Sequence, residues 1–437
     1  MNRPAQRLDE RFFAYRGGSL CAEAVPFDEL ARRFGTPSYV YSGAAMDDAY
    51  AAIDAALETT PHLVAYAVKA NGNLSILRRL GRAGCGMDIV SGGELARVLA
   101  AGVPAARILF SGVGKTDTEL RAALRAGVRS IHVESAPELD ALEGVAHELG
   151  ARAPVALRVN PNVDSETHPY IATGLHDNKF GLELPIARSL LPRILASPHL
   201  SLVGLGCHVG SQCRSPAPIE DAVAITASFA AECARAGARL RLLDAGGGWP
   251  IRYGDEVERI HPPADFGQAI RRGVERGGAA GLNLEIAVEP GRALVGDAGV
   301  LLTRVLYVKE QAGKRFVVVD AAMTELIRPA LYQAYHAVLP VTEPDPRAGR
   351  APADLVGPVC ETADFLALAR PLPPLRRGDL LAIRGAGAYG ASMASNYNGR
   401  PRAPEVMVDA NLMQLIRARE TIEDTWRGEM SSSVSIP

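Results

Sequence analysis

The stretch LVAYAVKANGN, which runs from Leu63 to Asn73, carries Lys69 between a run of apolar residues and a turn. Six apolar residues precede the lysine without a polar residue among them. Such an unbroken run is typical of a parallel strand that is covered on both faces. Asparagine and glycine follow the lysine, and these residues favour a turn. The stretch therefore predicts a buried strand that places one lysine at its carboxyl end.

Seven further apolar runs follow, and helical patterns separate them. The runs are GMDIVSGG (86–93), RILFSG (107–112), SIHVES (130–135), PVALRVNP (154–161), LVGLGCHVGS (202–211), LRLLDAGGG (240–248) and NLEIAVEPGR (283–292). One intervening helix is expected to have Asp117 as its N-cap and to stop at Gly127. Eight strand–helix units over about 250 residues predict a TIM-type (β/α)8 barrel. An open doubly wound sheet is the alternative, and eight units of similar size favour the barrel.

After Arg292 the chain changes to strands with little helix between them, which predicts a mostly antiparallel β domain. The segment FAYRGGSLCAEAVP (13–26) predicts a hairpin around Gly17 and Gly18 that joins this domain. The domain would then be formed from both chain ends. We expect residues 1–37 as its N-terminal part, 38–285 as the barrel, 286–428 as the rest of the β domain and 429–437 as a flexible tail.

The composition of the 437-residue chain excludes several classes of protein. Its formal net charge is −2, and no basic patch with interleaved aromatic residues occurs, so we expect no nucleic-acid partner. No apolar run reaches the roughly 18 residues of a membrane span, and the N-terminal segment has no apolar signal core. The six cysteines form no CxxC pair, so we expect no metal site, no disulfides and a cytoplasmic location.

Polar residues stand at the carboxyl ends of the predicted strands, where TIM barrels carry their chemistry. They are Lys69, Asp88 with Ser91, Ser111, Glu134, Arg158 with Asn160, His208 with Ser211, Asp244, and Glu289 with Arg292. A lysine at the mouth of a barrel can act as a nucleophile and form a Schiff base with a carbonyl group. The alternative for Lys69 is a side chain that extends into solvent or pairs with a barrel carboxylate.

The glycine run 246–248 follows the seventh predicted strand, and the segment EPGR (289–292) follows the eighth. Consecutive glycines allow backbone N–H groups to surround an anion, and TIM barrels often bind phosphate at this place. A tight turn is the alternative, but three glycines before a second glycine-containing turn favour an anion site. The segment GVGKT (112–116) resembles the end of a P-loop. Its first glycine would fall at Leu109 inside a strand, so we expect no nucleotide there.

His208 and Glu289 suit a flat, nitrogen-containing cofactor. An imidazole can stack on such a ring, and a carboxylate can hold a protonated pyridine nitrogen, which makes pyridoxal phosphate a better electron sink. The alternatives are a core histidine with its hydrogen bonds satisfied, and a salt bridge from Glu289 to Arg292.

The chain resembles the fold-type III pyridoxal-phosphate decarboxylases from about Phe13 to Glu423. The motifs that carry the resemblance are YAVKANGN, HVGSQ, DAGGGWP, EPGR, GPVCETAD and GAYGASMASNYN, in the order of that family. HPYIATGLHDNKFG (168–181) and LIRPALYQAYH (326–336) point to the branch that acts on diaminopimelate. The resemblance implies pyridoxal 5'-phosphate as cofactor and decarboxylation of meso-2,6-diaminopimelate to L-lysine and CO2, the last step of bacterial lysine synthesis. It also implies a homodimer with shared active sites.

The resemblance also implies a role for each site residue. Lys69 would bind the cofactor covalently, with Asp88 supporting it, His208 stacked on the ring and Glu289 at its nitrogen. The remaining cofactor-binding residues would be Ser211, Gly246, Gly247, Gly248, Pro290, Gly291, Arg292 and Tyr389. Cys360 would be the acid that returns a proton to the substrate carbon. Cys360 and Glu361 would reach the site from the other subunit.

Substrate choice would depend on the far end of diaminopimelate, which carries an ammonium and a carboxylate group. Glu361 would take the ammonium group. The carboxylate would go to Arg292, Arg328 and Tyr332, since arginine offers a bidentate fork, and Tyr389 would also contact the substrate. Arg328 and Tyr332 are four residues apart and share a face if their segment is helical. A salt bridge at the surface or at an interface is the alternative role of Arg328.

Two other functions are compatible with these motifs. A related pyridoxal-phosphate decarboxylase could act on another substrate, such as a D-amino acid or a carrier-bound amino acid. A non-catalytic regulator could keep the fold, but it would be expected to lose the lysine or the cysteine, and this chain retains Lys69 and Cys360.

Overall fold

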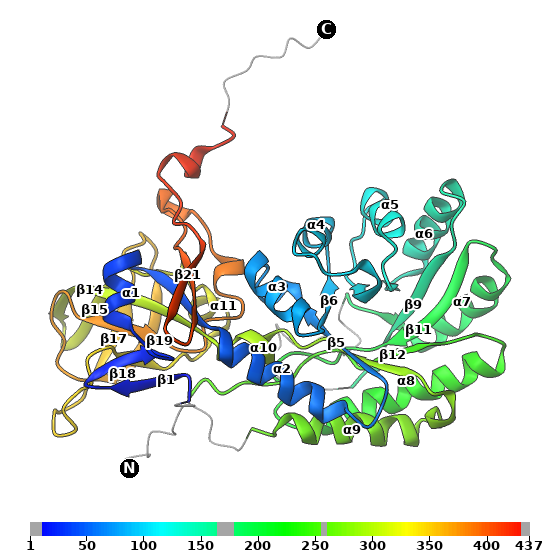
Figure 1. The fold of residues 1–437 in the computed structure, drawn as a ribbon, viewed down its shortest axis with the longest axis horizontal. Coiled ribbons are helices and arrows are strands. Elements are labelled where there is room, and N and C mark those ends of the chain that lie inside the picture. Colours follow the sequence, from blue (N-terminus) through cyan, green and yellow to red (C-terminus); the bar gives the residue numbers. More distant parts are fainter. Residues whose placement is uncertain (1–10, 164–178, 255–259, 430–437) are drawn as a thin grey trace, which may run out of the picture. The chain divides into compact units, whose positions relative to one another are not determined.

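The computed structural model describes residues 11–163, 179–254 and 260–429 (Figure 1). The chain divides into two compact units. The barrel unit comprises Ala44–Arg252 and Glu256–Asp297, and the β unit comprises Met1–Gly43, Tyr253–Asp255 and Ala298–Pro437. Among the described residues, no helix combines the length and the apolar character needed to cross a membrane.

Eight parallel strands close the barrel. They are β5 (His62–Ala67), β6 (Gly86–Ile89), β7 (Ile108–Phe110), β8 (Ser130–Val133), β9 (Ala153–Asn160), β11 (Leu200–Gly206), β12 (Leu242–Asp244) and β13 (Glu285–Val288). Each strand pairs with the next in this order, and β13 pairs with β5. The short strand β10 (Leu182–Glu183) pairs with β9. The predicted (β/α)8 barrel is therefore confirmed, and the open sheet is wrong.

Helices alternate with the barrel strands, and the first helix precedes β5. They are α2 (Gly43–Leu57), α3 (Leu74–Arg82), α4 (Gly92–Ala100), α5 (Asp117–Ala126), α6 (Ala136–Glu148), α7 (Leu184–Ala196), α8 (Ala217–Arg235), α9 (Pro263–Arg276) and the short α10 (Arg292–Val295). The side chains of Asn73, Ser91, Thr116 and Ser135 cap α3 to α6. Such caps satisfy N–H groups that have no partner inside the helix, and they fix where each strand–helix loop ends.

The N-cap of α5 is Thr116, so the prediction of Asp117 is wrong by one residue. The Thr116 hydroxyl accepts the N–H of Glu119, and the Glu119 carboxylate accepts the N–H of Thr116. This reciprocal capping box outweighs a single aspartate as a starting signal. Gly127 ends the helix as predicted, with a φ of 74°.

The main sheet of the β unit has nine strands and is mostly antiparallel. Its main path is β18 (Phe365–Leu372), β17 (Ala351–Val356), β15 (Lys314–Val319), β14 (Gly299–Gln311), β4 (Ser38–Ser42), β20 (Glu405–Asp409) and β21 (Leu412–Arg417), while β19 (Leu380–Ile383) pairs with β14 and β16 (Val338–Pro340). Helix α11 (Arg328–Tyr332) belongs to this unit. Because β4 lies between β14 and β20, the unit uses both parts of the chain, as predicted.

The N-terminal segment adds a second, smaller sheet. Strands β1 (Phe13–Arg16), β2 (Ser19–Ala22) and β3 (Val25–Pro26) are antiparallel neighbours, and helix α1 (Phe27–Phe34) follows them. Arg16 pairs with Ser19, so the predicted hairpin around Gly17 and Gly18 is confirmed.

The unit boundaries differ from the predicted boundaries after residues 37 and 285. Strand β4 lies within the predicted barrel segment but pairs with β14 and β20 of the β unit. Strand β13 pairs with β12 and β5, and the barrel unit extends to Asp297. Most of the predicted tail, residues 430–437, lies outside the described residues.

Candidate active site

Lys69 lies just beyond the first barrel strand, in the 3₁₀ turn η1 (Val68–Ala70). Its Nζ is 3.5 Å from Oδ2 of Asp88, whose side chain is fully buried, whereas the Lys69 side chain is 41% exposed. The two residues are close because Ala67 on β5 is in register with Asp88 on β6. The amine is thus held near a carboxylate yet remains accessible to a small molecule.

The carboxyl group of Asp88 has an unusual acidity. Burial raises its pKa to about 7, Glu289 adds to the rise, and Lys69 opposes it. Near neutral pH this carboxyl group can therefore either hold or release a proton beside the amine of Lys69.

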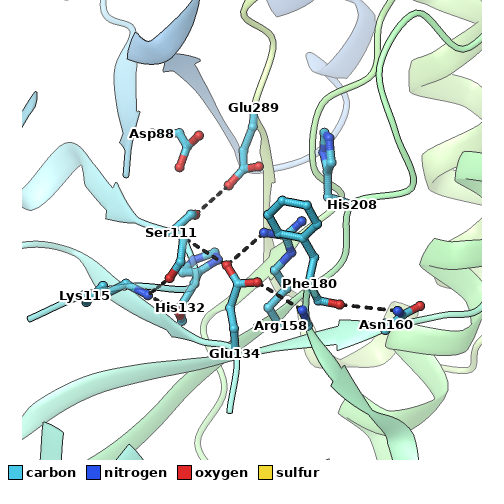
Figure 2. A network of polar contacts seen from close by, with 12 residues as sticks. Asp88, Ser111, Lys115, His132, Glu134, Arg158, Asn160, Phe180, His208 and Glu289 are labelled. Carbon is cyan, nitrogen blue, oxygen red and sulfur yellow. Dashed lines mark hydrogen bonds and ion pairs between the residues drawn. The ribbon is translucent and has the colours of Figure 1, made fainter. Parts of the chain in front are cut away.

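Glu289 follows β13 and lies near the carboxyl ends of β6 and β7. Its Oε1 accepts a hydrogen bond from the Ser111 hydroxyl at 3.2 Å, and Figure 2 shows Asp88 beside this pair. Burial raises the pKa of Glu289 to about 8, and Asp244 adds to the rise. In the protein chain alone Glu289 holds a proton near neutral pH, and a nearby cation would favour its ionised form.

His208 lies two residues after β11 and is neutral. Its Nδ1 accepts the N–H of Gly247 at 2.9 Å, so the ring proton is on Nε2. Burial lowers the pKa of His208 well below its ordinary value, and the charges of Arg158 and Lys69 add to this effect. An uncharged imidazole can cover a flat ring without adding a charge to it.

The loop after β12 requires glycine at positions 246–248 for steric reasons. A Cβ at Gly247 would lie 2.4 Å from the carbonyl oxygen of Glu289, and Gly246 and Gly248 have φ angles of 71° and 98°. The N–H groups of Gly246 and Gly247 donate to Asp244 and His208. The close approach of backbone segments thus accounts for the glycines, and phosphate binding by this loop stays a prediction.

The turn after β13 lies against the turn that carries Lys69. The N–H of Ala67 donates to the carbonyl of Pro290, and a Cβ at Gly291 would lie 3.1 Å from the Cβ atoms of Ala67 and Ala70. The guanidinium group of Arg292 is largely buried and donates to the Ser211 hydroxyl at 2.9 Å. The structure therefore brings together the predicted residues of these two turns.

A second layer of charged groups supports the site. Glu134 accepts a hydrogen bond from Arg158 at 2.9 Å (Figure 2). It also accepts from the N–H groups of Gly112 and Gly181. Asn160 donates to the carbonyl of Phe180. These contacts hold the loops after β7 and β9.

His132 is a buried residue of this layer that sequence reasoning missed. It belongs to a cluster with Asp244 and Glu289 whose ligand-type atoms lie within 4.8 Å of one another. Burial lowers the pKa of His132 to about 3, so the ring is neutral. A Cβ at Gly206 would lie 3.1 Å from the Cβ of Asp244, so Gly206 leaves space for the Asp244 side chain of this cluster. The sequence signal that could have indicated His132 was the presence of a histidine within a predicted buried strand.

Lys115, from the P-loop-like segment, is a structural residue. Its side chain is fully buried, and Nζ donates to the carbonyls of Gly112 and His132 and to Glu138, all within 2.7 Å. Because the Lys115 amine is hydrogen-bonded to three oxygens inside the protein, the lysine of the GVGKT segment has a structural role and not a role in binding nucleotide phosphate.

The predicted substrate-binding residues Arg328 and Tyr332 begin and end helix α11, so their segment is helical as expected. Arg328 is only 6% exposed, which excludes a surface salt bridge. Its guanidinium carbon lies 4.8 Å from the ring centre of Tyr253, and one of its nitrogens lies 2.9 Å from Nε2 of His336.

Cys360 and Glu361 are exposed residues in the connection between β17 and β18. The N–H of Cys360 donates to the side-chain oxygen of Asn398 at 2.9 Å. Tyr389 is half-buried and has a φ of 57°. Of the motif HPYIATGLHDNKFG, residues 168–178 lie outside the described residues.

Comparison with known proteins identifies the family. Residues 44–296 match the model of the pyridoxal-dependent decarboxylase pyridoxal-binding domain. The diaminopimelate decarboxylase of Pseudomonas aeruginosa is 50% identical, with coverage of 95% of this chain and 98% of that protein. The chain belongs to the diaminopimelate decarboxylase family. The enzyme of this family from Vibrio cholerae is 48% identical over 95% of this chain and 98% of its own length.

Solved structures of diaminopimelate decarboxylases have the same fold. The Helicobacter pylori enzyme complexed with L-lysine superposes with a TM-score of 0.87 and 41% identity over 92% of this chain and 98% of that chain. The M. jannaschii enzyme with L-lysine gives a TM-score of 0.92 and 35% identity over 98% and 99%.

The residues of the barrel unit fit pyridoxal phosphate, the cofactor of this family of decarboxylases. Lys69 supplies an accessible amine, Glu289 a buried carboxyl group and His208 an uncharged flat ring. The amine suits the aldehyde of the cofactor, the carboxyl group suits its basic ring nitrogen, and the imidazole suits a face of its ring.

Proposed function

We propose that this chain decarboxylates meso-2,6-diaminopimelate to L-lysine and CO2, as a carboxy-lyase of lysine biosynthesis. The observation that carries the proposal is the pairing of Lys69 with buried Asp88, at 3.5 Å, in a chain that is 50% identical to a diaminopimelate decarboxylase. An accessible amine beside a buried carboxyl group suits the covalent binding of an aldehyde cofactor.

The barrel residues would hold the cofactor and control its protons. When bound, pyridoxal phosphate withdraws electrons from the bond to the departing carboxylate. Glu289 holds a proton at the ring nitrogen, because an ion pair with a ring cation offsets the burial of its charge. His208 covers one ring face, and Asp88 holds a proton near Lys69. The turns at 246–248 and 290–292, with Ser211 and Tyr389, bind the phosphate.

The β-unit residues would select the substrate and complete the reaction. Arg328 and Tyr332, with Arg292 and Tyr389, bind the carboxylate at the far end of diaminopimelate, and Glu361 binds the ammonium group beside it. The burial of Arg328 supports this role, because a charge-assisted bond strengthens when water is excluded. Cys360 returns a proton to the substrate carbon.

We further propose a cytoplasmic homodimer in which Cys360 and Glu361 serve the site of the other subunit. Large apolar side chains of the β unit support an interface, since such exposed groups often mark protein contacts. They are Tyr397, Leu412, Leu415, Ile422 and Trp426, each 48–68% exposed. The exposure of Cys360 and Glu361 is compatible with a role beyond their own chain.

The test is to supply the purified protein with pyridoxal phosphate and meso-diaminopimelate and to measure lysine and CO2. Equal amounts of both products are expected, and the lysine should have the L configuration. L-lysine and L-ornithine serve as control substrates, because they lack the second carboxylate. Turnover of a different D-amino acid, with none of meso-diaminopimelate, would instead indicate the related decarboxylase considered above.

A further inference from the structure

His336 is a fully buried histidine whose two ring nitrogens both have hydrogen-bonding partners. Its Nε2 lies 2.9 Å from a guanidinium nitrogen of Arg328. Its Nδ1 lies 2.9 Å from the backbone carbonyl oxygen of Arg384. The sequence analysis assigned no role to this residue, although it ends the segment LIRPALYQAYH.

The two partners fix the protonation of the ring. A guanidinium group can only donate hydrogen bonds, so Nε2 must accept. A carbonyl oxygen can only accept, so Nδ1 must carry the proton and donate it. An imidazolium ring would direct an N–H against the N–H of Arg328. His336 is therefore neutral, with its proton on Nδ1.

The backbone places the ring at this point. Val338 on β16 pairs with Ile383 on β19, and the N–H of Arg384 donates to the carbonyl of Ala337 just beyond this pair. The next carbonyl along the chain is then within reach of the His336 ring. The position of His336 follows from strand pairing and not from a flexible loop.

Tyr253 holds the same guanidinium group from another side. Its ring contacts His336 edge to face, with centres 5.1 Å apart and planes at 77°, and lies under Arg328 at 4.8 Å. Gly385, with a φ of 67°, lets the backbone contact this ring, because a Cβ there would be 3.0 Å from Tyr253. The hydrogen bond to His336 and the ring face of Tyr253 thus both restrict the orientation of the guanidinium plane.

We propose that His336 is a positioning residue for substrate selection, which holds the Arg328 guanidinium group in the orientation that a substrate carboxylate requires. The inference rests on the proposed function, in which Arg328 binds the far carboxylate. A neutral imidazole takes one of five guanidinium donors and contributes no negative charge. It can therefore orient the group without competing electrostatically with the anion.

The competing explanation is that His336 only anchors the backbone after β19 through its bond to Arg384. Two substitutions separate these roles, since each keeps one of the two bonds. In His336→Gln the side-chain oxygen can reach the place of Nε2 and accept from Arg328, but the donor to Arg384 is lost. In His336→Asn the amide can replace the Nδ1 donor, but no acceptor reaches Arg328.

The readout is the ratio of inhibition constants for cadaverine and L-lysine, which differ only in one carboxylate. The holoenzyme is assayed with meso-diaminopimelate, and Arg328→Met defines the ratio that remains without the guanidinium group. We expect Arg328→Met to lose most of the preference for lysine, and His336→Asn to reduce it about tenfold, the size of one charge-assisted hydrogen bond. His336→Gln should stay within about threefold of the wild type.

A larger loss in His336→Gln than in His336→Asn, or an unchanged ratio in both, would overturn the positioning role. If neither variant folds, Tyr253→Leu with Tyr253→Phe as its control replaces the pair. Leucine should reduce the preference, phenylalanine should keep it, and equal ratios overturn the inference. An unchanged ratio in Arg328→Met would also overturn it, while turnover of meso-diaminopimelate by the wild type tests the proposed function separately.

Discussion

Two lysines that follow barrel strands have opposite environments. Lys69 is 41% exposed and 3.5 Å from one buried carboxylate, whereas Lys115 is fully buried and donates to three oxygens. A fully buried lysine whose amine donates to three protein oxygens is not accessible to a cofactor aldehyde. The environment of each amine, and not its sequence motif, separates the lysine that we propose to bind the cofactor from the structural lysine.

Borohydride reduction of the cofactor-loaded protein should fix pyridoxyl groups on the Lys69 peptide, with none on the Lys115 peptide. Peptide mapping by mass spectrometry measures this distribution.

Lys69→Ala should abolish the visible band of the cofactor with little change in stability. Lys115→Met should lower the free energy of unfolding by about 3 kcal/mol, because it leaves Glu138 buried without its cation. Label on Lys115 would contradict the assignment.

Glu289→Gln should stabilise the cofactor-free protein more at pH 8 than at pH 5. The folded-state pKa of Glu289 is raised from 4.5 to about 8, so its contribution to stability is complete below pH 4.5 and is lost as the pH rises through about 8. Glutamine is neutral throughout and avoids this loss. Chemical unfolding at both pH values should show a relative gain of about 3.5 kcal/mol.

A matched control for this variant is Glu119→Gln. The N–H groups of Gly92 and Thr116 lower the pKa of Glu119, so its contribution to stability is present at both pH values. No gain is expected at pH 8 for the control. A gain of equal size in both variants would mean that the effect reflects net charge and not the burial of Glu289.

Among the helices and strands, the sequence predicted those whose position depends on the local pattern of apolar and polar residues. Eight buried apolar runs predicted the barrel strands, and their polar ends predicted Lys69, Asp88, Ser111 and Glu289 as neighbours. The pattern could not predict that β4 belongs to the β unit, because its partners β14 and β20 lie far along the chain. His132 and His336 were missed for the same reason, since their contacts depend on strand pairing and not on sequence neighbours.

Gly247→Ala should displace the loop that follows β12. The added Cβ would lie 2.4 Å from the Glu289 carbonyl oxygen, and backbone cannot yield as a flexible side chain can. The expected loss in the free energy of unfolding is about 2 kcal/mol, within the range for overpacking. Weaker binding of pyridoxal phosphate, measured by equilibrium titration of its absorbance, should accompany it.

Gly144→Ala is the matched control, because the residue is in helix α6 and a Cβ there meets nothing within 4 Å. It should stabilise the protein by about 0.5–1 kcal/mol, since alanine favours helix more than glycine does. Cofactor affinity should be unchanged. A Gly247→Ala protein that binds the cofactor as tightly as this control would show that the loop does not contribute to the cofactor site.

For the whole molecule, the homodimer that we propose can be tested by mixing two inactive variants. Mixing Lys69→Ala protein with Cys360→Ala protein should restore activity, because one site of each hybrid dimer combines an intact lysine with an intact cysteine. A random mixture should recover about a quarter of wild-type activity, since half of the dimers are hybrids with one intact site. Subunit exchange is verified by native mass spectrometry, and exchange without recovery would place both residues in one chain.

The position of β4 has a consequence for the synthesis of the protein. Every residue of this strand is buried in the folded chain, yet Gly299, where its partner β14 begins, leaves the ribosome about 250 residues later. At ~5–20 residues per second, β4 waits roughly 13 to 50 seconds for that partner. The barrel strands are synthesised during this interval, while the segment SYVYS still lacks its partner strand. An unpaired strand of this kind favours association between nascent chains until β14 is available.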